Sequence, residues 1–416
     1  MRTRTLTIAD ATRPGGLPGD YVVTNARVYS MHAGPDPDRE RPLATDSDSF
    51  RVCDGRIVEL PAAHRDGPRL DLAGRVVLPG FVDCHTHTMF AGDRHAEFAA
   101  RLAGTSYEAI AAQGGGIRAT VAAVRAASDA ELLDVTLRRV RAFAREGVTT
   151  LEIKSGYGLD PAAELRMLRL IRHVAHRAPI LIEPTCLAAH ALPDDRPRGV
   201  YLEQILEQVL PVVAAEGLAR TTDLYIERLA FGLDEADALF AKAHELGLAV
   251  RAHTEQLSHS GGTLTAARAG ALSCDHLEYA TAEDAQAMAD SGSVAVLLPG
   301  AYYCLRETRL PPIAALRNAG VPIAIASDFN PGTSPVGSLL VSLHLAVVLF
   351  GLTPAEALVA ITRHAAAALG RKHDIGSLAP GKLANFSVWD LPAPEYLAYQ
   401  LGGLGPEAVF VLGKPV

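Results

Sequence analysis

The pattern of apolar and polar positions changes character near Val76, and this change predicts the main architecture. Beyond that point, apolar strand-like runs alternate with amphipathic stretches such as SDAELLDVTLRRVRAFAREG (128–147), whose apolar positions recur at helical spacing. The apolar runs occupy residues 76–84, 148–154, 180–188, 223–229, 248–253, 272–276, 293–298 and 321–328. Near-continuous apolar runs separated by helices are typical of a parallel sheet, and eight of them predict an α/β fold, a (β/α)8 barrel of the TIM type.

The two ends of the chain carry short β-type segments instead. YVVTNARVYSM, SFRVCDGRIVEL and RLDLAGRVVL lie between residues 20 and 77, and IGSLAPGKLANFSVWD and AVFVLGKPV follow the helical stretch 353–370. Neither end is long enough to form a core alone, so we expect the two to pair into one small β-sandwich domain beside the barrel. The predicted division is 1–77 and 376–416 for the small domain and 78–375 for the barrel.

Composition narrows the class of protein. Of 416 residues, 49% are hydrophobic and 21% charged, and the net charge of -8 is spread without a basic run, which argues against nucleic acid or an anionic membrane as partner. The five cysteines are odd in number and form no C-x-x-C pair, and the first residues lack the apolar core of a signal peptide. We therefore expect reduced thiols and a cytoplasmic location.

Polar residues stand at the ends of several predicted strands, where TIM-barrel enzymes place their catalytic groups. His85 and His87 follow the first strand, and side chains two residues apart on an extended chain point to the same side. His253 ends the fifth predicted strand and Asp328 the eighth. Three imidazoles and one carboxylate suit a single Zn or Fe(II) ion and leave room for water.

The residues also allow ordinary structural interpretations. An isolated His-x-His is a weak signal, Asp328 before Asn-Pro-Gly could simply start a turn, and His276 could be a satisfied core histidine with Asp275 as a helix cap. Their common register at strand ends favours the metal site, because a structural role does not demand it. A metal there supports hydrolysis, with His276 and Asp328 placed to orient water and pass on its proton.

At this point the sequence resembles the amidohydrolase superfamily and, more specifically, its imidazolonepropionase family. LPGFVDCHTH, a later AH, then DH and SD carry the broader likeness; KSGYGL, LLPGAYYCLRET and SDFNPGTSP carry the narrower one, from about Leu78 to Pro335. The resemblance implies hydrolysis of 4-imidazolone-5-propanoate to N-formimidoyl-L-glutamate with one bound Zn or Fe ion per subunit.

The resemblance also implies the site residues. The metal ligands fall on His85, His87, His253 and Asp328, and the substrate positions fall on Arg94, Tyr157, His190 and Gln256, with Asn330, Gly332 and Thr333 near the product. Arg94 suits the propionate, because a guanidinium binds a carboxylate through two hydrogen bonds. Tyr107 could assist or could pack its helix against the barrel, and His190 could polarise the ring carbonyl, hold the leaving nitrogen or serve packing.

One departure from the family pattern concerns the base. Some members carry an acid three residues after the third ligand histidine, where this chain has Gln256, which can hydrogen-bond a ring but cannot take a proton. Glu255 points to the other face if the strand continues, so we assign the general-base role to His276 with Asp328. Lys154, at the end of the second strand, reads as a positive group near the pocket or a strand-end ion pair.

Two other functions stay open at this stage. One is a related hydrolase or deaminase acting on another small nitrogen heterocycle, which Arg94 argues against because such bases lack a carboxylate. The other is a non-catalytic scaffold on the same barrel, which the intact ligand set argues against. For assembly, a homodimer is the commonest symmetric form and is what we expect.

Overall fold

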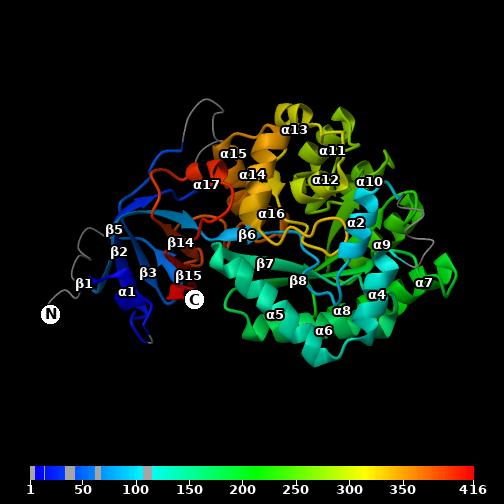
Figure 1. Cartoon of the computed structure of the whole chain (residues 1–416), viewed down its shortest axis with the longest axis horizontal. Coiled ribbons are helices and arrows are strands. Elements are labelled where there is room, and N and C mark those ends of the chain that lie inside the picture. The colour runs from blue at the N-terminus through cyan, green and yellow to red at the C-terminus, as the bar shows by residue number, and fades with distance from the viewer. Residues whose placement is uncertain (1–4, 14, 33–42, 61–66, 106–114) are drawn as a thin grey trace.

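The computed structural model describes residues 5–13, 15–32, 43–60, 67–105 and 115–416. Figure 1 shows two parts, a barrel of strands surrounded by helices and a smaller sheet beside it that contains both the first and the last strands of the chain. No helix of the described ranges combines the length and apolar character needed to cross a membrane.

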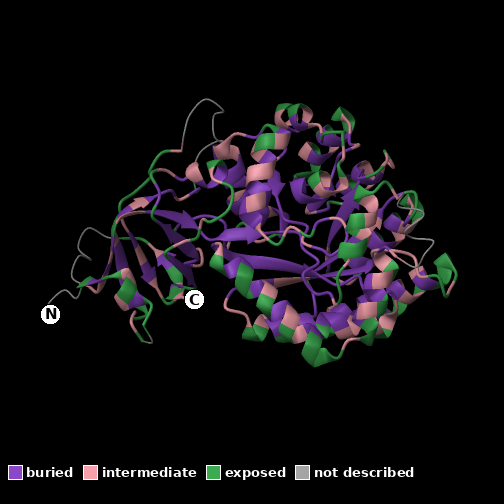
Figure 2. Cartoon of the chain, in the orientation of Figure 1, coloured by how far each residue is buried: buried purple, intermediate pink, exposed green. Residues whose placement is uncertain are grey.

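Within these ranges, eight parallel strands form the barrel sheet, in the order in which they occur along the chain. They are β6 (Phe81–Asp83), β7 (Val148–Lys154), β8 (Leu181–Ala189), β9 (Thr221–Ile226), β10 (Ala249–Thr254), β11 (Ser273–His276), β12 (Val294–Leu297) and β13 (Ile323–Ile325). Every predicted strand is present with its boundaries shifted by a few residues, which confirms the (β/α)8 architecture. Figure 2 shows the strands buried at the centre, with the exposed positions on the outer faces of the helices.

The barrel helices form where the amphipathic stretches predict them. Ser128 caps its helix by accepting a hydrogen bond from the backbone N–H of Glu131, and Thr281 and Thr353 cap theirs in the same way. The barrel helices are α2 (His95–Leu102), α4 (Ile117–Ala126), α5 (Asp129–Arg145), α6 (Pro161–Arg177), α7 (Arg198–Gln204), α8 (Leu210–Glu216), α9 (Leu233–Glu245), α10 (Gly262–Arg268), α11 (Ala282–Ser291), α12 (Pro299–Leu305), α13 (Ile313–Ala319), α14 (Leu339–Phe350), α15 (Pro354–Val359) and α16 (Ala365–Ala368). Short π-helical turns, Ile205–Val209 and Ala360–His364, join α7 to α8 and α15 to α16.

The second sheet joins the two ends of the chain, as the sequence predicts. Its strands run in the order β16-β15-β14-β5-β2-β3-β4, with β1 also paired to β5. The central contact is antiparallel pairing of β5 with β14, so a strand before the barrel holds a strand after it. Its elements are β1 (Thr5–Leu6), β2 (Asp20–Val28), β3 (Phe50–Cys53), β4 (Arg56–Val58), β5 (Arg69–Pro79), β14 (Phe386–Trp389), β15 (Ala408–Val411) and β16 (Lys414–Pro415), with the short helices α1 (Ile8–Ala11) and α17 (Tyr396–Tyr399).

The first predicted barrel strand, 76–84, is wrong in one respect, because it is two strands. Residues up to Pro79 belong to β5 of the small sheet, and the barrel strand β6 begins at Phe81. The break falls at Gly80, where an added Cβ would lie 2.2 Å from the Thr149 side chain. The chain passes between the two sheets there because glycine allows this close approach.

Candidate metal centre and surrounding mouth

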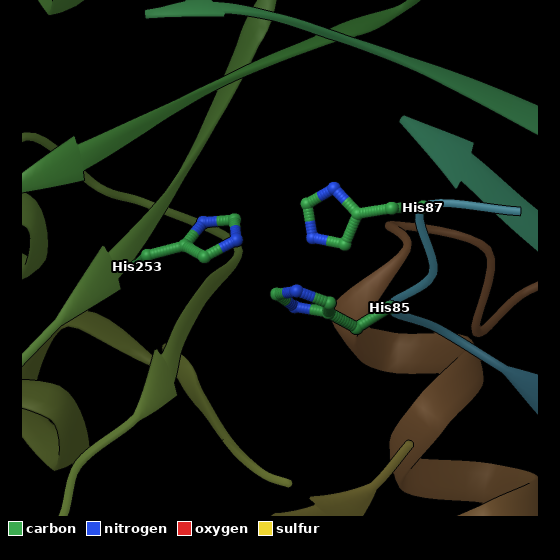
Figure 3. A group of neighbouring side chains, drawn as sticks. All are labelled: His85, His87 and His253. Atoms are coloured by element: carbon green, nitrogen blue, oxygen red, sulfur yellow. The ribbon is translucent and has the colours of Figure 1, made fainter. Parts of the chain in front are cut away.

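Three imidazoles meet at the carboxyl ends of the barrel strands. His85 and His87 follow β6, and His253 lies on β10. One ligand nitrogen from each lies within 4.8 Å of the others, all three side chains are buried, and Figure 3 shows the rings gathered around one point. The barrel therefore brings together residues that are 168 positions apart in the sequence, from His85 to His253.

Asp328 joins this group from the segment that follows β13, the last strand of the barrel. Its Oδ1 lies 3.5 Å from His85 Nε2 and 3.4 Å from His87 Nε2. The backbone holds it there, since Asp328 N–H donates to the His85 carbonyl and His87 N–H donates to the Phe329 carbonyl, both at 3.0 Å. Asp328 has φ of 50°, a left-handed conformation that is uncommon outside glycine and that recurs at functional sites.

Several of the imidazole nitrogens in this group have no hydrogen-bond partner in the described part of the chain. His85 Nδ1 is 2.6 Å from Asp275 and His253 Nδ1 is 3.0 Å from Asp223, while the Nε2 atoms of both are buried and unpaired. Burial lowers the pKa of His85 and of His87 well below the ordinary histidine value. Both rings are therefore neutral and can offer a nitrogen lone pair to a metal ion. Buried, unpaired imidazole nitrogens beside a carboxylate fit a Zn or Fe ion.

His276 lies against the same group. It ends β11, and its ring centroid is 5.8 Å from that of His85 and 5.5 Å from that of His253. Burial lowers the pKa of His276 to about 3, with Asp328 acting in the opposite direction. His276 and Leu277 have φ of 83° and 75°, so the chain turns sharply after the strand and is strained there. The helix-cap interpretation of Asp275 is wrong, because its carboxylate binds His85 and Arg251.

Tyr157 and His190 lie on the far side of His87. His190 stacks on His87 with ring centroids 4.9 Å apart and planes 19° apart, and Tyr157 lies 5.8 Å from His87 and 5.4 Å from His190. His190 Nδ1 is hydrogen-bonded to the Gly156 carbonyl at 3.0 Å, which makes Nδ1 the protonated nitrogen and Nε2 the acceptor. Burial raises the pKa of Tyr157, so its hydroxyl keeps its proton.

The loop that carries Tyr157 is held by Glu164, a residue that the sequence does not single out. Its buried carboxylate accepts hydrogen bonds from the backbone N–H groups of Gly156, Gly158 and Leu159 at 2.7–2.9 Å. A Cβ on Gly158 would lie 2.5 Å from the Glu164 backbone nitrogen, so the turn also needs glycine. The one sign of this role in the sequence is that Glu164 stands among the apolar positions of the buried face of α6.

Arg94 lies against the loop that follows β13. An added Cβ on Gly332 would lie 2.1 Å from Arg94 Nη1, so the guanidinium occupies the space beside this glycine. Arg94 Nε donates to Glu97 at 2.8 Å, and its side chain is 11% exposed. Arg101, on α2, donates a hydrogen bond to the Gly332 carbonyl at 3.0 Å.

Asn330 shapes this loop with its own side chain. Its Oδ1 accepts from the backbone N–H groups of Gly332 and Thr333 at 2.8 and 2.7 Å, and its Nδ2 donates to the Asp328 carbonyl. The amide is thus engaged within the loop, beside the Asp328 backbone. Asn330 is buried and Thr333 half-buried.

Gln256 and Glu255 take different roles. The Glu255 carboxylate accepts from Ser260 Oγ and from the backbone N–H groups of Gly262 and Thr263, at the start of α10, so it is fully engaged in holding a loop. Gln256 follows it and is 9% exposed. Tyr107 lies outside the described residues.

Replacing Glu255 with Gln should lower stability more than it alters chemistry. The amide keeps the size but loses charge-assisted hydrogen bonds, and we expect a loss of about 2 kcal/mol in the free energy of unfolding, measured with urea. Glu203→Gln, on an exposed position of α7, is the matched control. An unchanged stability together with a kcat reduced by roughly a thousandfold would instead make Glu255 a base.

The comparisons with known proteins agree with this geometry. The Amidohydrolase family model matches residues 76–416. The chain is 51% identical over 370 residues to an imidazolonepropionase of Pseudomonas aeruginosa, covering 87% of this chain and 92% of that protein. It is 53% identical over 349 residues to an imidazolonepropionase of Pseudomonas putida, covering 83% and 87%. The fold is similar to a 5-methylcytosine deaminase from Klebsiella pneumoniae, with a TM-score of 0.71, 17% identity and coverage of 95% and 97%. The chain therefore belongs to the amidohydrolase family and, within it, to the imidazolonepropionases.

Proposed function

We propose that this chain hydrolyses the ring amide C–N bond of 4-imidazolone-5-propanoate and releases N-formimidoyl-L-glutamate. The observation that carries the proposal is the convergence of His85, His87 and His253 beside Asp328, with the Nε2 atoms of His85 and His253 buried and without a hydrogen-bond partner among the described residues. The names of relatives that are 51–53% identical over most of the chain support the same substrate.

The proposed ligands of one Zn or Fe ion are His85, His87, His253 and Asp328. When bound, a divalent ion at such a site lowers the pKa of a water molecule and polarises a carbonyl oxygen. The N3O donor set accepts either metal, and availability decides between them.

The proposed proton path uses His276 and Asp328. His276 is neutral at physiological pH, because burial lowers its pKa to about 3, so the ring can accept a hydrogen bond from the attacking water. Asp328 takes the proton of that water and returns it to the ring nitrogen that leaves when the amide bond breaks. The left-handed backbone at both residues fixes the directions of these side chains.

The proposed substrate-binding residues comprise one charged group and several neutral groups. Arg94 binds the propionate through its Nη groups, because its contact with Glu97 uses only Nε. His190 and Tyr157 hold the ring carbonyl and nitrogen, and Gln256 offers a further hydrogen-bonding group to the ring. Asn330, Gly332 and Thr333 shape the wall behind Arg94, and Tyr107 completes the proposed set.

The second candidate is a related deaminase or hydrolase of another small nitrogen heterocycle. Its specific support is the shared fold with a 5-methylcytosine deaminase, which at 17% identity concerns the fold alone. Arg94 favours the first candidate, because an uncharged base gives its guanidinium nothing to bind.

Location and assembly are part of the proposal as well. The five free cysteines support a reducing compartment such as the cytoplasm. The homodimer follows only from the general prevalence of twofold symmetry, and light scattering of the purified protein measures it.

Turnover of 4-imidazolone-5-propanoate by the metal-replete protein tests the function directly. We expect loss of the imidazolone absorbance, formation of N-formimidoyl-L-glutamate, loss of activity after chelation, and recovery on adding Zn²⁺ or Fe²⁺. Absence of turnover by protein that contains one metal ion per chain would contradict the proposal.

Arg94→Ala should raise KM for this substrate by about a hundredfold, because the variant loses two charge-assisted hydrogen bonds to the propionate. The kcat should change much less, since the carboxylate is remote from the reacting bond. Arg138→Ala, an exposed ion-paired position on α5, is the control. An equal loss with the propionamide analogue of the substrate would show that Arg94 does not recognise the carboxylate.

A further inference from the structure

A chain of charged side chains runs through the barrel interior between two of the ligand histidines. In the described part of the protein it consists of Asp223, Lys154, Glu152, Arg251 and Asp275, which come from β9, β7, β10 and β11 and are 0% exposed. Negative and positive groups alternate along it. TIM-barrel interiors are usually filled by layers of branched apolar residues, so this arrangement needs a reason.

One end of this row of charged side chains contacts His253. Lys154 Nζ donates to Glu152 Oε1 and to Asp223 Oδ2, both at 2.7 Å. The other oxygen of Asp223 lies 3.0 Å from His253 Nδ1. The ion-pair interpretation of Lys154 is confirmed, and its partners lead directly to a proposed metal ligand.

The other end of the row of charged side chains contacts His85. Arg251 donates from Nη1 to Glu152 Oε1 at 2.9 Å and from Nη2 to Asp275 Oδ2 at 3.0 Å. Asp275 Oδ2 lies 2.6 Å from His85 Nδ1, and its Oδ1 accepts from Ser273 at 2.6 Å. Both carboxylates that contact the Nδ1 atom of a ligand histidine are therefore fixed by a buried cation.

Glu152, at the midpoint, also holds the backbone of the His-x-His segment. Its Oε2 accepts from the Thr86 N–H at 2.9 Å, and Thr86 Oγ1 donates to the Glu152 carbonyl at 2.5 Å. Thr86 lies between His85 and His87, so Glu152 also fixes the backbone that joins these two histidines.

This arrangement determines which nitrogen each histidine presents. A carboxylate beside Nδ1 accepts a hydrogen bond from the Nδ1–H group, so the proton stays on Nδ1 and the lone pair lies on Nε2, the atom that a metal ion needs. A buried ion chain is a costly way to fill a barrel, because well-packed apolar residues often give equal or greater stability. The stability of the fold therefore does not explain it, whereas orientation of two metal ligands does.

We propose that Lys154, Glu152 and Arg251 are positioning residues for the metal: through Asp223 and Asp275 they hold His253 and His85 as Nδ1–H tautomers, with Nε2 presented before the ion binds. This inference rests on the proposed metal site. His87 is outside the arrangement, since its Nδ1 has no hydrogen-bond partner among the described residues.

The first test uses the metal-free wild-type protein with ¹⁵N-labelled histidine. Nitrogen chemical shifts distinguish the two neutral tautomers, and His85→Gln and His253→Gln assign the two signals. We expect both residues to be Nδ1–H before metal is added. Nε2–H at either residue would overturn the proposal without any change to the buried chain.

The second test removes one cation at a time with Lys154→Met and Arg251→Met. The control is Arg317→Met, which removes a mostly buried guanidinium on α13 that is paired with Glu356 on α15 and, in the described part of the chain, has no contact with the charged row. Zn²⁺ affinity is measured by competition with a chelator on folded protein, checked by circular dichroism. We expect each test variant to bind Zn²⁺ at least tenfold more weakly and the control to bind as the wild type does.

The two variants should also differ in which histidine responds. Lys154→Met should disturb the tautomer of His253 first, and Arg251→Met that of His85. Wild-type Zn²⁺ affinity in both variants would overturn this inference and leave the proposed function intact. Failure of the wild-type protein to bind Zn²⁺ or Fe²⁺ would instead contradict the proposed metal site itself.

Discussion

Closure of the barrel between its first and last strands is the interaction on which the site depends. The closing contacts are backbone hydrogen bonds from Asp328 N–H to the His85 carbonyl and from His87 N–H to the Phe329 carbonyl. The residues that complete the cylinder are thus the same residues that face the proposed metal. Each of these bonds fixes the backbone of a proposed ligand. The backbone positions of His85, His87 and Asp328 therefore follow from closure of the barrel.

The rest of the mouth is built by carboxylates that bind backbone N–H groups. Glu164 holds the loop with Tyr157, Glu255 holds the start of α10, and Glu227 accepts from the N–H groups of Leu257 and Ser258 at 2.9 and 2.8 Å. Loops over a barrel mouth have backbone groups that no strand pairs, and a buried carboxylate can satisfy several of them at once. These acids therefore order the loops that carry the proposed substrate contacts.

Much of this structure can be predicted from the sequence, because it follows from local pattern. Apolar runs and helix caps give the strands and helices, and His85, His87, His253 and Asp328 are recognisable by their common position at strand ends. The break at Gly80 could not be predicted, since only the approach of Thr149 requires it. The roles of Glu152, Arg251 and Glu164 were equally hidden. Their partners lie on other strands and loops, and a charged residue within an apolar run carries no local sign of what it binds. For the same reason, the sequence around Asp275 allows a helix cap, whereas its partners are His85 and Arg251.

The central claim is that His85, His87, His253 and Asp328 bind one catalytic metal ion. Anomalous X-ray diffraction from crystals of the metal-replete protein, recorded on both sides of the Zn and Fe absorption edges, tests it most directly. The account predicts one anomalous peak per chain, about 2.0–2.2 Å from a nitrogen of each histidine and an oxygen of Asp328. A peak bound by other residues, or no peak at this position in active protein, would contradict it.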